Sequence, residues 1–172
     1  MSPVNRRTPL PVGTPRGRLV VSAVVVEATQ RALAEVHSEI PHEALVWWLG
    51  RKVGDDTVVV SLIRPLTDST PQSVMVSEVA AGLASRRARE FGLGVVAQIH
   101  THPGTDTRHS DGDDELIFMP FEGMFSLVVA EYGHGRLDSP KGFSAHQFQD
   151  DRLVLLDQSV DAIIVAPVEV AL

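Results

Sequence analysis

The sequence predicts an α/β or α+β fold in which a single mixed β-sheet is flanked by helices. Three observations lead to this prediction. Short runs rich in β-branched residues recur along the chain and are typical of strands. Longer segments carry apolar residues at helical spacing. Strand-like and helix-like segments are mixed without strict alternation, so a regular series of βαβ units is not expected.

The first elements follow from composition and periodicity. Residues 1–18 are rich in proline, arginine and threonine and show no hydrophobic period, so we interpret them as a flexible N-terminal tail. Residues 19–26 are mostly β-branched and predict a strand. Residues 27–40 have apolar side chains at helical spacing and predict a helix.

A hairpin should follow this helix. Residues 43–49 predict a strand and residues 57–63 predict its partner, because the glycine and aspartates at 54–56 are typical of a tight turn. The first of these strands contains Trp47 and Trp48. Neighbouring residues of a strand point to opposite faces, so at least one tryptophan should pack in the core.

The central part of the chain predicts an amphipathic helix and a strand. Residues 65–71 contain prolines at both ends and predict a loop. Residues 72–91 carry an apolar face opposite a face rich in arginine, which predicts a helix. Residues 95–101 then predict a strand, followed by a polar loop at 103–109 and a short acidic helix that Ser110 begins.

The C-terminal part predicts further strands. Residues 125–130 and 142–149 predict two strands separated by a loop at 133–141, and residues 162–170 predict a last strand. No repeat or second domain is visible. Residues 19–172 are therefore expected to form one domain.

Composition excludes several classes of function. The chain has 172 residues, 44% of them hydrophobic, which is enough for one core. A net charge of −7 argues against nucleic-acid binding. No cysteine is present, so any metal must be held by histidine or carboxylate side chains. No apolar run approaches the roughly 20 residues needed to cross a bilayer. We expect a cytoplasmic protein without membrane contact.

One short stretch carries chemistry. His100 and His102 lie two positions apart at the end of a predicted strand, so both imidazoles should face the same side. Ser110 is a favourable N-cap, and Asp113 lies three residues later in the first helical turn. Two imidazoles and one carboxylate leave one tetrahedral position open, as in catalytic zinc sites. Either pair alone is weak evidence for a metal site, because a histidine pair on a strand or a capping box usually has no catalytic or metal-binding role.

The order of these residues resembles the signature of the JAMM metallopeptidases, also called the MPN or JAB domain. That signature is His-x-His-Pro, a serine after a seven-residue gap and an aspartate three positions later, which here gives His100, His102, Ser110 and Asp113. It also includes an upstream glutamate at the start of a strand, and Glu43 resembles that residue. The resemblance covers approximately residues 19–170 and is closest to the compact prokaryotic type.

The resemblance implies an MPN/JAB-like fold with a cytidine-deaminase-like architecture. It implies a zinc ion (Zn²⁺) held by His100, His102 and Asp113, a water activated by this zinc with Glu43 as general base, and an oxyanion stabilised by Ser110. The expected activity is that of a zinc-dependent isopeptidase or peptidase, similar to a deubiquitinase. It would cleave after the C-terminus of a ubiquitin-like or sulfur-carrier protein. His109 and His134 match no position of the signature and are interpreted as loop residues, with His109 close enough to the site to influence its charge.

Two alternatives stay open. Two histidines and one carboxylate also form the facial triad of non-haem iron enzymes, although Glu43 would then have no role. The chain could also be a catalytically silent MPN-type scaffold that binds protein partners. A homodimer is compatible with the sequence. The substrate, the bond cleaved and the pathway are not determined by these residues.

Overall fold

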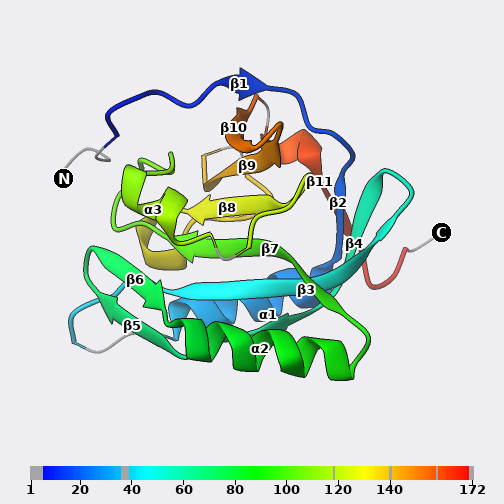
Figure 1. The fold of residues 1–172 in the computed structure, drawn as a ribbon, viewed down its shortest axis with the longest axis horizontal. Helices are drawn as coiled ribbons and strands as arrows, with labels where there is room; N and C mark the ends of the chain where they lie inside the picture. Colours follow the sequence, from blue (N-terminus) through cyan, green and yellow to red (C-terminus); the bar gives the residue numbers. More distant parts are fainter. Residues whose placement is uncertain (1–5, 36–38, 118, 140, 158, 171–172) are drawn as a thin grey trace.

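A computed structural model describes residues 6–35, 39–117, 119–139, 141–157 and 159–170 (Figure 1). Its main feature is a nine-stranded sheet with the strand order β1-β10-β9-β8-β7-β3-β4-β2-β11. The sheet contains parallel pairs, such as β7 with β8, and antiparallel pairs, such as β3 with β7. This arrangement confirms the predicted mixed sheet flanked by helices. The strands of this sheet are β1 (Val12–Gly13), β2 (Leu19–Ser22), β3 (Leu45–Val53), β4 (Asp56–Ile63), β7 (Gly94–Thr101), β8 (Phe125–Val129), β9 (Phe143–Gln149), β10 (Arg152–Leu156) and β11 (Ile163–Ala166).

The remaining elements lie around the sheet. The helices are α1 (Ala23–Ala34), α2 (Glu78–Glu90) and α3 (Asp111–Glu115), with two short 3-10 helices, η1 (Glu131–Gly133) and η2 (Ser159–Ala162). Among the helices that the structure describes, none is long and apolar enough to cross a membrane. A separate hairpin is formed by β5 (Thr67–Thr70) and β6 (Ser73–Val76).

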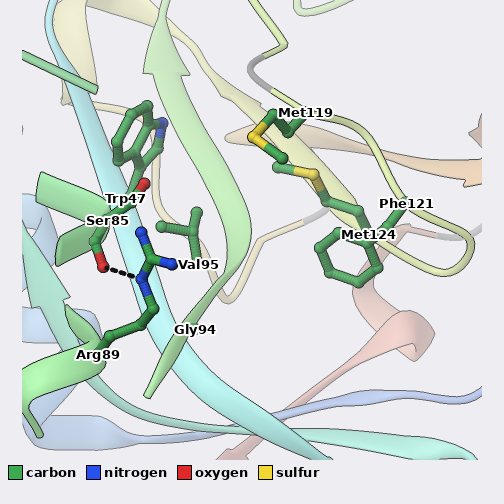
Figure 2. Close-up of a pocket in the computed structure, with 8 residues that line it drawn as sticks. All are labelled: Trp47, Ser85, Arg89, Gly94, Val95, Met119, Phe121 and Met124. Carbon is green, nitrogen blue, oxygen red and sulfur yellow. Dashed lines mark hydrogen bonds between the residues drawn. The ribbon is translucent and has the colours of Figure 1, made fainter. Parts of the chain in front are cut away.

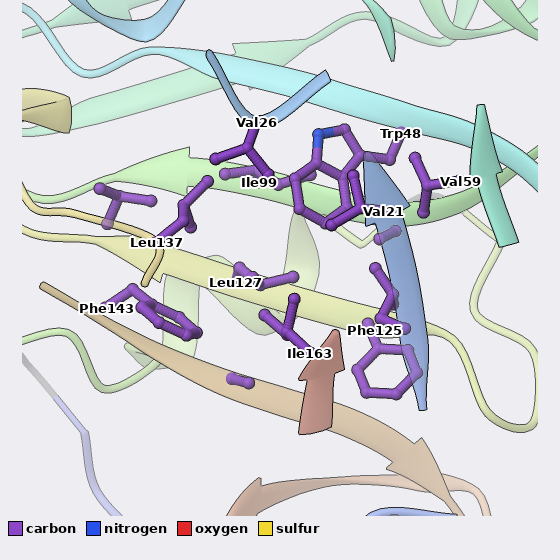
Figure 3. Close-up of a cluster of buried hydrophobic side chains, with 14 of the residues drawn as sticks. Val21, Val26, Trp48, Val59, Ile99, Phe125, Leu127, Leu137, Phe143 and Ile163 are labelled. Carbon is purple, nitrogen blue, oxygen red and sulfur yellow. The ribbon is translucent and has the colours of Figure 1, made fainter. Parts of the chain in front are cut away.

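The two tryptophans of β3 pack into separate hydrophobic clusters. Trp48 is fully buried in the larger cluster, beneath α1 and against the central strands (Figure 3). Its indole Nε1–H donates a hydrogen bond of 2.7 Å to the Oγ1 of Thr29 on α1. Trp47 is 1% exposed and packs in the smaller cluster with Ala81 and Ala84 of α2. The alternation of side chains therefore buries both tryptophans, one in each cluster.

Several boundaries differ from those predicted, including the end of β3, which continues to Val53 rather than ending at residue 49. The first strand ends at Ser22, whose hydroxyl oxygen caps α1 by accepting the N–H of Val25 at 3.3 Å. The β-branched run that predicted a longer strand is therefore partly helical, because capping and packing outweigh intrinsic propensity. The helix ends at Ala34 rather than at residue 40, and residues 36–38 lie outside the described residues. The predicted last strand ends at Ala166 rather than at residue 170.

Other elements were missed. The loop expected at 65–71 contains β5, and the helix expected from residue 72 is preceded by β6 and begins at Glu78, behind the N-cap Ser77. Strand β10 was not predicted. These strands are short and are stabilised by their partners, and the apolar run at residues 153–156 is the signal by which the sequence could have revealed β10.

The N-terminal segment was expected to be a tail without regular structure. In the structure, residues 6–18, here called the N-terminal arm, cross the top of the sheet and contain β1 (Figure 1). Strand β1 pairs in parallel with β10, with Val12 opposite Leu155. The side-chain amide of Gln149 donates a hydrogen bond of 3.0 Å to the carbonyl of Thr14. The arm is therefore bound to the edge of the sheet.

Candidate metal centre

Polar side chains line one face of the central strands. Gln98 of β7 lies opposite Ser126 of β8, which in turn lies opposite His146 of β9. Residues in register on neighbouring strands share a face, and His100 lies two positions after Gln98 on the same face. All four side chains are buried. This buried polar face forms the floor of the candidate site.

His100 and His102 lie side by side at the end of β7, as the spacing predicted. Their ring centroids are 5.2 Å apart, and their side chains are almost completely buried. His102 follows the last residue of the strand, but its backbone N–H still donates to the carbonyl of Val129 at 2.9 Å. The strand geometry therefore continues through both histidines.

Asp113 closes the group from α3. Ser110 and Asp113 form the predicted capping box: the Ser110 hydroxyl oxygen accepts the Asp113 N–H at 3.1 Å, and the Asp113 carboxylate accepts the Ser110 N–H at 2.6 Å. The same carboxylate lies 3.4 Å from His100 Nε2 and 3.1 Å from His102 Nε2. The helix start thus directs this carboxylate at both imidazoles.

These three residues fit a metal ion. One potential ligand atom from each lies within 4.8 Å of the others. His102 Nδ1 lies 2.8 Å from the carbonyl of Asp106, so Nδ1 carries a proton and leaves Nε2, which faces the Asp113 carboxylate at 3.1 Å, as the nitrogen that could bind a metal in place of its proton. Both ring nitrogens of His100 are buried and have no hydrogen-bond partner among the described residues. A metal would satisfy a buried nitrogen that otherwise costs free energy.

The charge states of His100 and Asp113 suit a cation. Burial lowers the pKa of His100, which favours the neutral imidazole that a metal needs. Burial alone would raise the pKa of Asp113, but its contacts with His100 and His102 hold that pKa far below the ordinary range. Burial alone would lower the pKa of His102, but its contacts with Asp113 and Asp106 outweigh this and raise that pKa, so a metal would bind His102 in competition with a proton. The group therefore presents two imidazoles and one anionic oxygen.

Glu43 lies beside this group, although it is far away in the sequence. Its backbone N–H donates to the carbonyl of Thr70 at 2.9 Å, and the next residue, Ala44, donates to Thr101 Oγ1 at 2.8 Å. The first bond links the residues just before β3 to β5, and the second links them to the end of β7. Glu43 is only 5% exposed. Burial raises its pKa to about 7, an effect that the nearby His102 opposes and Asp113 reinforces.

Two further histidines lie in the site, and the sequence indicated only that one of them, His109, is close to it. His109 was interpreted as a loop residue, and His146 was not singled out, but both are fully buried. The ring centroid of His109 is 5.3 Å from that of His100 and 4.4 Å from that of His146. The position of His109 directly before the N-cap Ser110 was the one local feature of the sequence that indicated its proximity to the site. His134, also expected in a loop, is exposed just after η1.

A separate pocket lies at the opposite end of β7 (Figure 2). Its volume is about 210 Å³, and it is lined mainly by apolar side chains. The loop that follows α3 contributes Met119 and Phe121, and α2 contributes Arg89, whose Nε–H donates to the carbonyl of Ser85 (Figure 2). Val95, which lines this pocket, lies near the start of β7, whereas His100 lies near its end. The pocket is therefore separate from the metal-binding group.

Comparisons with known proteins agree with this fold. A family model described as prokaryotic homologs of the JAB domain matches residues 25–139, and the N-terminal arm lies outside the match. No curated protein matches the chain. The solution structure of a protein from Desulfitobacterium hafniense has a TM-score of 0.63 at 21% identity and covers 87% of this chain and 93% of its own. The solution structure of a protein from Salinibacter ruber has a TM-score of 0.55 at 21% identity, with 88% and 94% covered. At this identity, both structures support the fold alone.

Proposed function

This chain belongs to the prokaryotic homologues of the JAB domain, and from this premise we propose that it is a zinc-dependent peptidase or isopeptidase. The observation that carries the proposal is the buried group of His100, His102 and Asp113 with a fourth side chain, Glu43, beside it. Three protein ligands leave a coordination position open for a reactant, whereas structural zinc sites use four. A site with only a scaffolding role would not need a buried carboxylate beside the ligands.

His100, His102 and Asp113 would hold the zinc ion. When bound, zinc lowers the pKa of a coordinated water towards about 7 and polarises a carbonyl group. Glu43 would accept a proton from the attacking water and donate it to the leaving amine. In the metal-free site burial raises the pKa of this carboxyl group to about 7, and the charge of a bound zinc ion would lower it and favour the carboxylate that accepts the proton of the water.

Ser110 would stabilise the developing oxyanion. Its oxygen accepts the N–H of Asp113, so its own hydroxyl proton can be donated to another acceptor. Capping and oxyanion binding can therefore be combined in one side chain.

The substrate that we propose is a protein with an extended C-terminal tail, of the ubiquitin-like or sulfur-carrier class. The reaction would release whatever follows that tail, either a lysine side chain or a peptide extension. An extended tail can be recognised through backbone hydrogen bonds to a neighbouring strand. We further propose that the reaction takes place in the cytoplasm.

Metal analysis and cleavage assays test this proposal together. The purified wild-type protein is expected to contain about one zinc per chain and to cleave a ubiquitin-like protein from a C-terminal fusion. Glu43→Gln should keep the zinc and lose roughly 10²- to 10⁴-fold in turnover, the usual contribution of a general base. Glu27→Gln, a change at an exposed glutamate of α1, is the matched control and should retain full turnover.

The outcomes separate the alternatives. Zinc and substrate binding without cleavage by the wild-type protein would favour a silent scaffold. Bound iron with oxygen-dependent turnover would favour a non-haem iron enzyme. Normal turnover in Glu43→Gln would exclude the proposed base.

A further inference from the structure

The N-terminal arm ends against the turn that carries Ser110 and Asp113. The guanidinium of Arg6 donates hydrogen bonds to the carbonyls of His109, at 3.2 Å, and Ser110, at 3.1 Å. It also donates to the carboxylate of Asp114 at 2.8 Å. The Arg6 side chain is only 15% exposed. One cation thus contacts the turn at three points.

The buried side chain of His109 contacts the same turn from the side of the sheet. Its Nδ1 lies 3.1 Å from the Asp114 carboxylate, which can only accept, so Nδ1–H is the donor. Its Nε2 lies 2.8 Å from the hydroxyl of Ser126 on β8. Arg6, Asp114, His109 and Ser126 therefore form one continuous chain of hydrogen bonds from the arm to the sheet.

The rest of the arm holds Arg6 in place. Arg16, near the other end of the arm, forms ion pairs of 2.8 Å with Glu122 and 2.6 Å with Asp150. Between these ends, β1 pairs with β10. The arm is thus bound at several points along its length, which lowers the entropy cost of placing Arg6 against the turn.

We propose that Arg6 is a positioning residue for the metal centre, which holds the turn so that the carboxylate of Asp113 stays directed at His100 and His102. The inference rests on the metal site of the proposed function. Metal ligands need to be held within about 0.5 Å of their working geometry, and the groups behind them supply that constraint. Arg6 contacts the backbone carbonyl of Ser110, three residues before Asp113, and the side chain of the next residue, Asp114.

Hydrogen–deuterium exchange of the metal-free 172-residue chain tests the contact without any metal. Arg6→Gln should speed exchange of the amides of Ser110 and Asp113 by about tenfold, because their local opening becomes easier. Arg7→Gln is the matched control, since the Arg7 side chain is 94% exposed and lies 4.0 Å from Asp111. Exchange at wild-type rates in Arg6→Gln would overturn the proposal.

Metal affinity tests the consequence. Arg6→Gln should bind zinc about tenfold more weakly than wild type, at the lower end of the range for groups behind metal ligands. It should also alter the visible spectrum of bound cobalt, and Arg6→Lys should restore part of the affinity. Faster exchange with unchanged zinc affinity would overturn the positioning role. A wild-type protein that binds no zinc would instead contradict the proposed function, and the exchange experiment would still decide whether Arg6 holds the turn.

Discussion

Replacing Glu43 with glutamine should change how the stability of the metal-free protein depends on pH. The carboxyl group has a folded-state pKa of about 7, compared with an ordinary value of 4.5, mainly because it is buried. Between these values the unfolded chain has lost the proton and the folded chain has kept it. Stability is therefore lost as the pH rises from 4.5 through 7. Glutamine cannot ionise, so the variant escapes this loss.

The magnitude follows from the two pKa values. The burial of Glu43 costs about 1.4 kcal/mol at pH 5.5 and about 3.3 kcal/mol at pH 8. The difference in unfolding free energy between Glu43→Gln and wild type should therefore shift by about 2 kcal/mol in favour of the variant between pH 5.5 and pH 8. For a domain of this size, that corresponds to roughly 4–8 °C in melting temperature.

Thermal unfolding followed by circular dichroism, with a chelator present throughout, measures the effect. The quantity to compare is the difference in melting temperature between variant and wild type at about pH 5.5 and at about pH 8. Any pH-independent effect of the amide cancels in this comparison. The exposed Glu27→Gln is the control and should show the same difference at both pH values. If Glu43→Gln also shows no change between the two pH values, the reasoning about its burial is refuted.

Three other predictions concern the ligands, the helix cap and the core. His102→Ala should reduce bound zinc strongly, because it removes one of three protein ligands, and full zinc occupancy by metal analysis would contradict the assignment. Ser110→Ala should keep the zinc, lose on the order of 10²-fold in turnover and cost about 1 kcal/mol in stability; a stability loss with intact turnover would leave Ser110 as a cap only. Thr29→Val should cost about 1–3 kcal/mol in chemical denaturation, because the buried Trp48 Nε1–H loses its acceptor. An unchanged denaturation midpoint would show that this hydrogen bond adds no stability.

Parts of the candidate site could be predicted because they depend on local geometry. His100 and His102 face the same side because strand residues alternate with a period of two. Ser110 and Asp113 meet because an N-cap and the third residue of its helix, three positions later, lie within hydrogen-bond distance. The resemblance to a known signature then indicated which fold could join these two pieces.

Other parts required the packed molecule. Glu43 lies far before His100 in the sequence, and no local pattern relates the two residues. Their proximity depends on the antiparallel pairing of β3 with β7, in which Leu45 lies opposite His100. The raised pKa of Glu43 depends on the same packing, because desolvation is a property of the surroundings and not of the sequence.

The sequence by itself determined the mixed fold, the main strands, the paired histidines and the capped acidic helix, since each reflects periodicity over a few residues. Only the tertiary structure decided that His109 packs against His100, that His146 lies in the site and that Arg6 reaches the turn before Asp113. Hydrogen bonds between residues about a hundred positions apart, such as that of Arg6 with Asp114, depend on strand order and on how segments pack. Local periodicity carries no information about either.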